Sequence, residues 1–192
     1  MKIIKENKNN IKEIITALKN GAVLVCPTDT VYGLICDAGN EKAVEKIFSV
    51  KNRDKSKPLL AFVESISGAK KIAEVNEKQE EFLKKNWPGK VTVVLKAKKG
   101  LSALVRKENT VGVRIPNYKF LNLILETFGK PLAQTSANIS GDSAITEINE
   151  VLKQFEAKER QPDIIIDAGN LPKSEPSTII DLTSKNKKII RN

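Results

Sequence analysis

Hydroxyl and carboxylate side chains are concentrated in segment 27–34 of this chain, Pro-Thr-Asp-Thr-Val-Tyr-Gly-Leu. The segment follows the apolar run 22–26, which predicts a buried strand, and Pro27 is expected to end the hydrogen-bonded ladder of that strand. Ligands of α/β proteins collect beyond the carboxyl ends of strands, so hydroxyls and a carboxylate at this point predict a binding site. The alternative is a capped turn whose Thr and Asp side chains only satisfy backbone donors.

Further hydroxyl, amide and cationic groups occur in five other short segments. These are Lys51-Asn52-Arg53, 110–116, 136–141, 177–181 and Arg191. Arg114 lies inside the apolar run 111–115, where an unpaired charge is costly, so it requires a carboxylate from the protein or from a ligand. Lys51 and Arg53 follow a predicted helix, and a role as cations at the helix C-terminus is their alternative.

The chain contains no histidine, and this excludes whole classes of catalyst. Ser-His-Asp and Cys-His machinery, zinc proteases and zinc deaminases of the familiar kinds all require that residue. The phosphate-binding patterns Gly-x-x-x-x-Gly-Lys-Ser/Thr and Gly-x-Gly-x-x-Gly are also missing from the sequence. An enzyme built from this chain must therefore rely on carboxylates, hydroxyls, lysines and arginines, or on positioning and electrostatics.

Composition indicates a globular protein with an excess of positive charge. The 192 residues are 40% apolar, and 33 basic against 23 acidic residues give a net charge of +10. That excess fits RNA or a phosphate-bearing substrate, although solvated lysines spread over the surface would give the same number. No apolar stretch reaches membrane-spanning length and the N-terminus has no secretory h-region, so a cytoplasmic location is expected. Cys26 and Cys36 match no zinc or disulfide pattern and are expected to be buried.

Helical and strand patterns alternate along the whole chain. Helices are expected over 11–18, 41–50, 65–86, 118–128 and 147–155, and strands over 22–26, 59–63, 91–95, 111–115 and 163–167. Further expectations are a strand leading into Ser136, a loop over 100–109, and a terminal hairpin formed by 177–182 and 187–191. No repeat or linker divides the chain, so a single α/β domain over residues 1–192 is expected, with a twisted mixed sheet flanked by helices.

The six polar segments occur in the order and approximate spacing of the YrdC family, which the chain resembles from about residue 10 to Arg191. The resemblance implies a YrdC-like fold and synthesis of threonylcarbamoyl-AMP. That reaction joins L-threonine, bicarbonate or CO2, and ATP with Mg²⁺, and it releases pyrophosphate. A carbamate oxygen attacks the α-phosphorus, so the enzyme must neutralise and align anions, which requires no histidine.

The resemblance also implies residue roles. The catalytic set is Lys51, Arg53, Ser136 and Asn138. The threonine contacts are Thr30, Phe62, Arg114, Ser136 and Ser177. The nucleotide contacts are Arg53, Lys57, Thr110, Asn138, Thr146 and Arg191. A planar guanidinium suits both carboxylate and phosphate, and this accounts for the arginines.

Several positions depart from the family pattern, among them Phe62 and Tyr118, which stand where histidine is usual. They leave open a YciO-like paralogue with an altered substrate, and a double-stranded RNA or ribosome-associated module is a further alternative. The resemblance implies transfer of the adenylate to a separate threonylcarbamoyl transferase complex, which modifies adenosine 37 of tRNAs that read ANN codons. Weak tRNA binding, no membrane association and no tightly bound protein metal complete the expectations.

Overall fold

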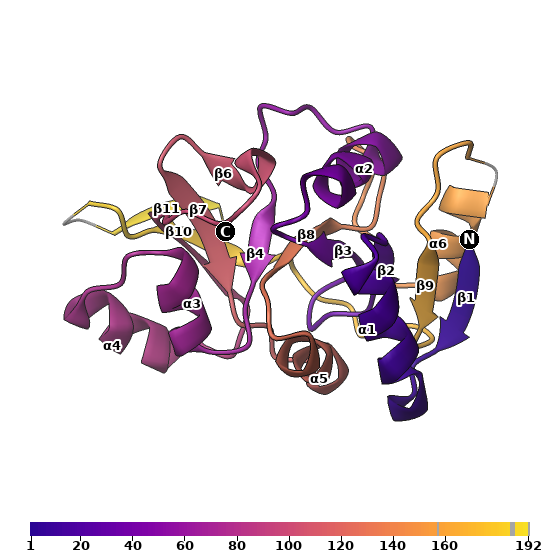
Figure 1. The fold of residues 1–192 in the computed structure, drawn as a ribbon, viewed down its shortest axis with the longest axis horizontal. Helices are drawn as coiled ribbons and strands as arrows, with labels where there is room; N and C mark the ends of the chain where they lie inside the picture. Colours follow the sequence, from indigo (N-terminus) through magenta and orange to yellow (C-terminus); the bar gives the residue numbers. More distant parts are fainter. Residues whose placement is uncertain (157, 185–186, 192) are drawn as a thin grey trace.

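The computed structural model describes residues 1–156, 158–184 and 187–191, and its centre is one twisted mixed β-sheet (Figure 1). The strand order is β1 (Lys2–Lys5), β9 (Ile164–Asp167), β2 (Leu24–Cys26), β3 (Gly33–Asp37), β8 (Leu132–Ser136), β4 (Leu60–Phe62), β7 (Thr110–Arg114), β5 (Val91–Lys96), β10 (Thr178–Asp181) and β11 (Lys188–Arg191). β6 (Arg106–Lys107) pairs with β7. Parallel and antiparallel pairs alternate irregularly, which confirms the expected mixed sheet.

Six α-helices and two short 3₁₀ helices connect the described strands. They are η1 (Lys8–Asn10), α1 (Ile11–Lys19), α2 (Glu41–Lys51), α3 (Ile66–Ile72), α4 (Glu77–Asn86), η2 (Ala103–Val105), α5 (Lys119–Phe128) and α6 (Ile148–Glu156). The side chain of Asn40 accepts from the Ala43 amide and begins α2 as predicted. Asn52, with φ of 52°, ends this helix in the left-handed region and turns the chain toward Arg53.

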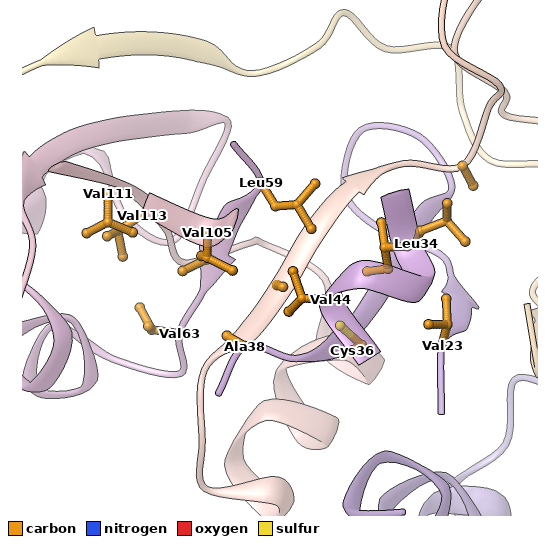
Figure 2. Packing of buried hydrophobic residues seen from close by; sticks show 14 of the residues in the cluster. Val23, Leu34, Cys36, Ala38, Val44, Leu59, Val63, Val105, Val111 and Val113 are labelled. Carbon is orange, nitrogen blue, oxygen red and sulfur yellow. The ribbon is translucent and has the colours of Figure 1, made fainter. Parts of the chain in front are cut away.

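Helices cover the two faces of the sheet unequally. Residues of α2, α3, α4 and α6 pack into the larger core, and Figure 2 shows Val44 of α2 beside Leu34 and Cys36 of β3. On the other face α1 and α5 form a second core, with Leu18 and Phe120 among its buried side chains. The two helices lie side by side in the lower part of Figure 1. This second core includes Phe62 of β4 but no residue of β5, β7 or β10. The α1 and α5 helices therefore leave the part of this face formed by those three strands uncovered.

Four parts of the fold differ from the sequence-based expectation. Gly33 and Leu34 open β3, which pairs antiparallel with both β2 and β8, so the polar loop is shorter than predicted. The expected helix over 65–86 is two helices, because Ala73 forms a β-bridge with Ala97 and Asn76 starts α4 with a capping box. The expected loop over 100–109 contains η2 and β6, and β1 was not predicted.

The terminal hairpin and the buried cysteines are as predicted. β10 and β11 pair antiparallel, with a register irregularity between Ile179 and Ile180. Cys26 and Cys36 are buried free thiols whose pKa values burial raises strongly. Among the described residues no helix is both long and apolar enough to span a bilayer.

Candidate active site

A cavity of about 810 Å³ occupies the part of the sheet face that α1 and α5 leave open. Its floor consists of alternate residues of neighbouring strands, including Leu60 of β4, Gly112 of β7 and Gln134 of β8. A Cβ at Gly112 would stand 2.6 Å from Leu60 Cδ2, so the floor packs closely here and a larger residue would displace the Leu60 side chain. The site therefore lies on the sheet face, and the Thr30 loop that follows β2 forms only one of its walls.

The structure gathers most of the predicted site residues around this cavity. Eight of them line it: Thr30, Arg53, Lys57, Thr110, Arg114, Ser136, Ser177 and Arg191. The remaining four, Lys51, Phe62, Asn138 and Thr146, are not part of its described lining. Segments separated by more than a hundred residues thus converge as the resemblance implied, while the role of each residue stays a prediction.

Lys51 holds the Ser136 loop from behind the cavity. Its side chain is buried, and Nζ lies 2.7 Å from Ser136 O, 2.7 Å from Asn138 O and 2.8 Å from Asn138 Oδ1. Burial lowers the pKa of Lys51 to about 7, and the nearby charge of Arg53 acts in the same direction. The three oxygens accept from the Lys51 side chain, which thereby fixes the loop, and the catalytic role implied by the resemblance stays a prediction.

Replacing Lys51 by methionine is expected to loosen this loop. Lys51→Met should lower the free energy of unfolding by roughly 1–3 kcal/mol, because buried oxygens of Ser136 and Asn138 would lose their donor. Urea unfolding measures the change. Lys42→Met is the matched control, since Lys42 is an exposed residue on the same helix. Equal effects of the two substitutions would contradict this role of Lys51.

Arg53 shapes the segment that bounds the cavity on another side. Nε donates to Lys57 O at 2.8 Å, and Nη2 donates to Pro58 O at 3.1 Å. These two side-chain bonds go to the segment after α2 and not to the last carbonyls of that helix. The guanidinium lines the cavity, and burial lowers its pKa.

Arg114 is paired with a protein carboxylate, which answers the question that the sequence left open. Nη2 donates to Asp29 Oδ1 at 2.7 Å and Nε donates to Gly89 O at 2.8 Å, while Asp29 Oδ2 accepts from the Asn117 amide at 3.0 Å. Only 3% of the Arg114 side chain is exposed. Two of the five N–H donors are thereby used, and the side chain still lines the cavity, so a ligand carboxylate can be held as well.

Two pairs of hydroxyl side chains belong to the site: Thr28 with Thr30, and Thr92 with Ser177. Thr28 Oγ1 accepts from the Thr30 and Val31 amides and lies 3.0 Å from Thr30 Oγ1, so it organises the first loop. Ser177 Oγ lies 2.9 Å from Thr92 Oγ1. Arg191 Nη2 donates to Ser177 O at 2.9 Å, so the last strand fixes the position of Ser177.

Three of the four residues outside the lining make contacts within the protein, and their expected ligand contacts stay predictions. Phe62 is fully buried, and its ring centroid lies 5.8 Å from Arg114 Cζ, so it supports the arginine. Asn138 Nδ2 donates to Ile139 O and Asp142 O, which fixes its own loop. Thr146 accepts at its carbonyl from the Leu171 amide, on the segment that follows the cavity wall.

The electrostatic signature of the site is a set of desolvated cations. Among the described lysines and arginines, those with clearly lowered pKa values are Lys51, Arg53, Arg114 and Arg191, and burial is the main cause for each. Three of these four line the cavity, and the fourth holds one of its walls. Desolvated charges concentrated at one cavity mark a functional site, and an anionic ligand would restore the lost solvation.

The structure adds residues that the sequence did not single out as contacts. Asp29 is the partner of Arg114, and the need of a buried arginine for a carboxylate was the signal that could have identified it. Lys107 and Asp181 line the cavity, giving its described lining five basic side chains and one carboxylate. Ile190 also lines it, although nothing in the sequence marked that residue.

Fold and site together define an α/β protein with a cavity rich in basic side chains, and comparisons identify its family. The Sua5/YciO/YrdC family model, described as "Telomere recombination", matches residues 16–192. A putative threonylcarbamoyl-AMP synthase of Methanocaldococcus jannaschii is 38% identical over 186 residues, which cover 95% of this chain and 86% of that relative. The threonylcarbamoyl-AMP synthase of Pseudoalteromonas translucida is 32% identical over 189 residues, covering 96% and 98%. The chain therefore belongs to the Sua5/YciO/YrdC family.

Solved structures agree with this assignment. Pyrococcus abyssi Sua5 complexed with L-threonine superposes with a TM-score of 0.90 at 31% identity, covering 99% of this chain. The present chain spans only 56% of that longer structure. Escherichia coli YciO superposes with a TM-score of 0.88 at 26% identity, covering 100% of this chain and 93% of YciO. The expected YrdC-like fold is confirmed.

Proposed function

We propose that this protein is an L-threonylcarbamoyladenylate synthase, which makes threonylcarbamoyl-AMP and pyrophosphate from L-threonine, bicarbonate or CO2, and ATP. Relatives that match nearly the whole chain have this activity in their names, and the Pyrococcus abyssi structure contains L-threonine. The single observation that most supports the proposal is the cavity itself. Its described lining combines five basic side chains with hydroxyls, which suits an anionic carbamate, ATP and the pyrophosphate that leaves.

The chemistry needs charge compensation and alignment more than proton transfer. The threonine amine adds to CO2 to form a carbamate, and a carbamate oxygen then bonds to the α-phosphorus as the bond to pyrophosphate breaks. Arg114 would hold the threonine carboxylate, and Thr30, which lines the same cavity, would contact threonine as well. Arg53 and Lys57 would neutralise phosphate oxygens from the opposite side, and Ser136 stands on the loop that Lys51 fixes.

Mg²⁺ is expected to enter as part of the MgATP substrate. Magnesium in such sites is held by one or two carboxylates together with substrate phosphates, and Asp181 supplies one carboxylate in the described lining. Within the described ranges no cluster of three or more His, Cys, Asp or Glu side chains could hold a metal ion. In the cytoplasm the adenylate would pass to a threonylcarbamoyl transferase complex that modifies adenosine 37 of tRNAs reading ANN codons.

Pyrophosphate release tests the proposed function. The purified protein with MgATP should release pyrophosphate only when both threonine and bicarbonate are present. A YciO-like paralogue with another substrate would show ATP binding without this dependence on threonine. The assay must distinguish these two functions because the structure is also similar to YciO. In addition, Phe62, next to Arg114, stands where histidine is usual in the family.

Thermal melting separates the enzyme from an RNA-binding module. MgATP should raise the melting temperature, because a ligand that binds only the folded state stabilises it by mass action. Structured RNA should bind weakly, lose affinity steeply as salt rises, and leave threonine-dependent pyrophosphate release unchanged. Strong stabilisation by RNA at physiological salt, with no response to MgATP, would contradict the proposal.

A further inference from the structure

β11 brings two consecutive side chains to the same cavity. Side chains of a regular strand alternate between the two faces of a sheet, so neighbours such as Ile190 and Arg191 would point to opposite sides. Both nevertheless line the cavity. The pairing with β10 explains this, because Ile189 lies opposite Ile180 while Arg191, two residues on, lies opposite Ile179.

Ile190 is therefore the extra residue of a β-bulge. Bulges re-aim side chains next to active sites, and here the bulge adds an isoleucine to a wall that already contains Arg191. The Ile190 residue is 56% exposed, which is unusual for a large apolar residue at a cavity wall. A ligand in the cavity would cover it.

The exposed isoleucine continues an apolar patch on the cavity floor. Val94 of β5 and Ile179 of β10 also line the cavity, and their strands lie side by side with β11 next to them. In Figure 1, β10 and β11 lie together at the end of the sheet away from β1. Val94, Ile179 and Ile190 form an apolar patch across three neighbouring strands, and two charged side chains lie beside it: Asp181, level with Val94, and Arg191, level with Ile179.

The opposite part of the cavity is polar and cationic. Arg53 and Lys57 follow α2, and Ser136 ends β8, five places from β11 in the strand order. The cavity therefore suits a ligand that is highly charged at one end and has, at the other end, an apolar face bordered by polar groups. A nucleoside triphosphate has this character, with phosphates at one end and the flat face of a nucleobase at the other.

We propose that Ile190, presented by the bulge in β11, is a nucleotide-positioning residue that packs against the base of ATP together with Val94 and Ile179. This inference rests on the proposed function for the identity of the nucleotide. The patch contributes to binding the base and adds nothing to binding the phosphates. ATP and inorganic tripolyphosphate thus separate its contribution from that of the cations.

Calorimetric titration of three proteins with MgATP and with magnesium tripolyphosphate tests the inference. Ile190→Ala should weaken ATP binding about tenfold, since most of the apolar contact is lost, and should leave tripolyphosphate binding unchanged. Ile189→Ala is the matched control, because Ile189 is a neighbour of the same type with 58% exposure, opposite Ile180. It should bind both ligands as the wild type does. Ile190→Leu should keep ATP binding within about twofold of wild type.

Each other outcome would overturn the inference. Unchanged ATP binding in Ile190→Ala would show that the base lies elsewhere. Equal weakening of ATP and tripolyphosphate would mean that Ile190 acts only through Arg191 and the phosphates. Equal losses in Ile189→Ala and Ile190→Ala would indicate a general effect on the hairpin. Any of these results in a protein with threonine-dependent pyrophosphate release would leave the proposed function intact, whereas a wild-type protein that binds no ATP would overturn both.

Discussion

Arg53→Ala should lower the turnover of threonine-dependent pyrophosphate release by a factor of roughly 10² or more. The guanidinium lines the cavity and is partly desolvated, so it acts strongly on developing phosphate charge. Its bonds to Lys57 O and Pro58 O lie on the short segment after α2, and their loss should cost little stability. Initial-rate kinetics and thermal melting of the same preparations measure the two effects.

Lys55→Ala is the matched control for Arg53→Ala. Lys55 lies on the same segment, but its exposed side chain pairs with Glu45 of α2. It should keep the wild-type turnover, because exposed ion pairs contribute little. Wild-type turnover in Arg53→Ala, with unchanged melting, would instead make Arg53 a structural cation of the loop.

Arg114→Ala is expected to have the largest combined effect on stability and on substrate binding. It leaves the buried Asp29 carboxylate without its partner, which should cost about 3–5 kcal/mol in the free energy of unfolding. In the protein that remains folded, the threonine requirement should rise far more than the ATP requirement, because the carboxylate clamp is lost. Urea unfolding and the two KM values measure these changes.

A double variant separates the two roles of Arg114. Arg114→Ala with Asp29→Ala removes both charges and should recover much of the stability, while the threonine requirement stays high. Equal increases in the KM values for threonine and ATP would contradict the clamp and point to disorder of β7. Recovery of threonine binding in the double variant would contradict it equally.

Local patterns were enough to predict many elements of this fold. Asn40 as a helix cap, the apolar periodicity of α1 and α5 and the terminal hairpin depend on neighbours in the sequence, so they could be predicted. β3 was missed because Gly33 and the polar residues before it are typical of a loop, while its ladder partners in β8 lie about a hundred residues away. The helical pattern over 65–86 did not predict the break between α3 and α4, because that break depends on a bridge between Ala73 and the distant Ala97.

The site shows the same limit at the level of single residues. Motif order predicted which segments converge, and eight of the twelve chosen residues line the cavity. The sequence could not predict which residues would pair across the fold, because the partners are far apart in the chain. Arg114 and Asp29 are 85 residues apart, as are Lys51 and Ser136. Ile190 depends on a register irregularity between two strands, which no local pattern encodes.

The identity of the reaction product tests the central claim most directly. The protein is incubated with MgATP, threonine and carbon-13 bicarbonate. The products are separated immediately and identified by mass spectrometry. The account predicts an adenylate that contains AMP, threonine and one labelled carbon, formed together with pyrophosphate. Conversion of ATP without any product that joins threonine and the labelled carbon to AMP would contradict it.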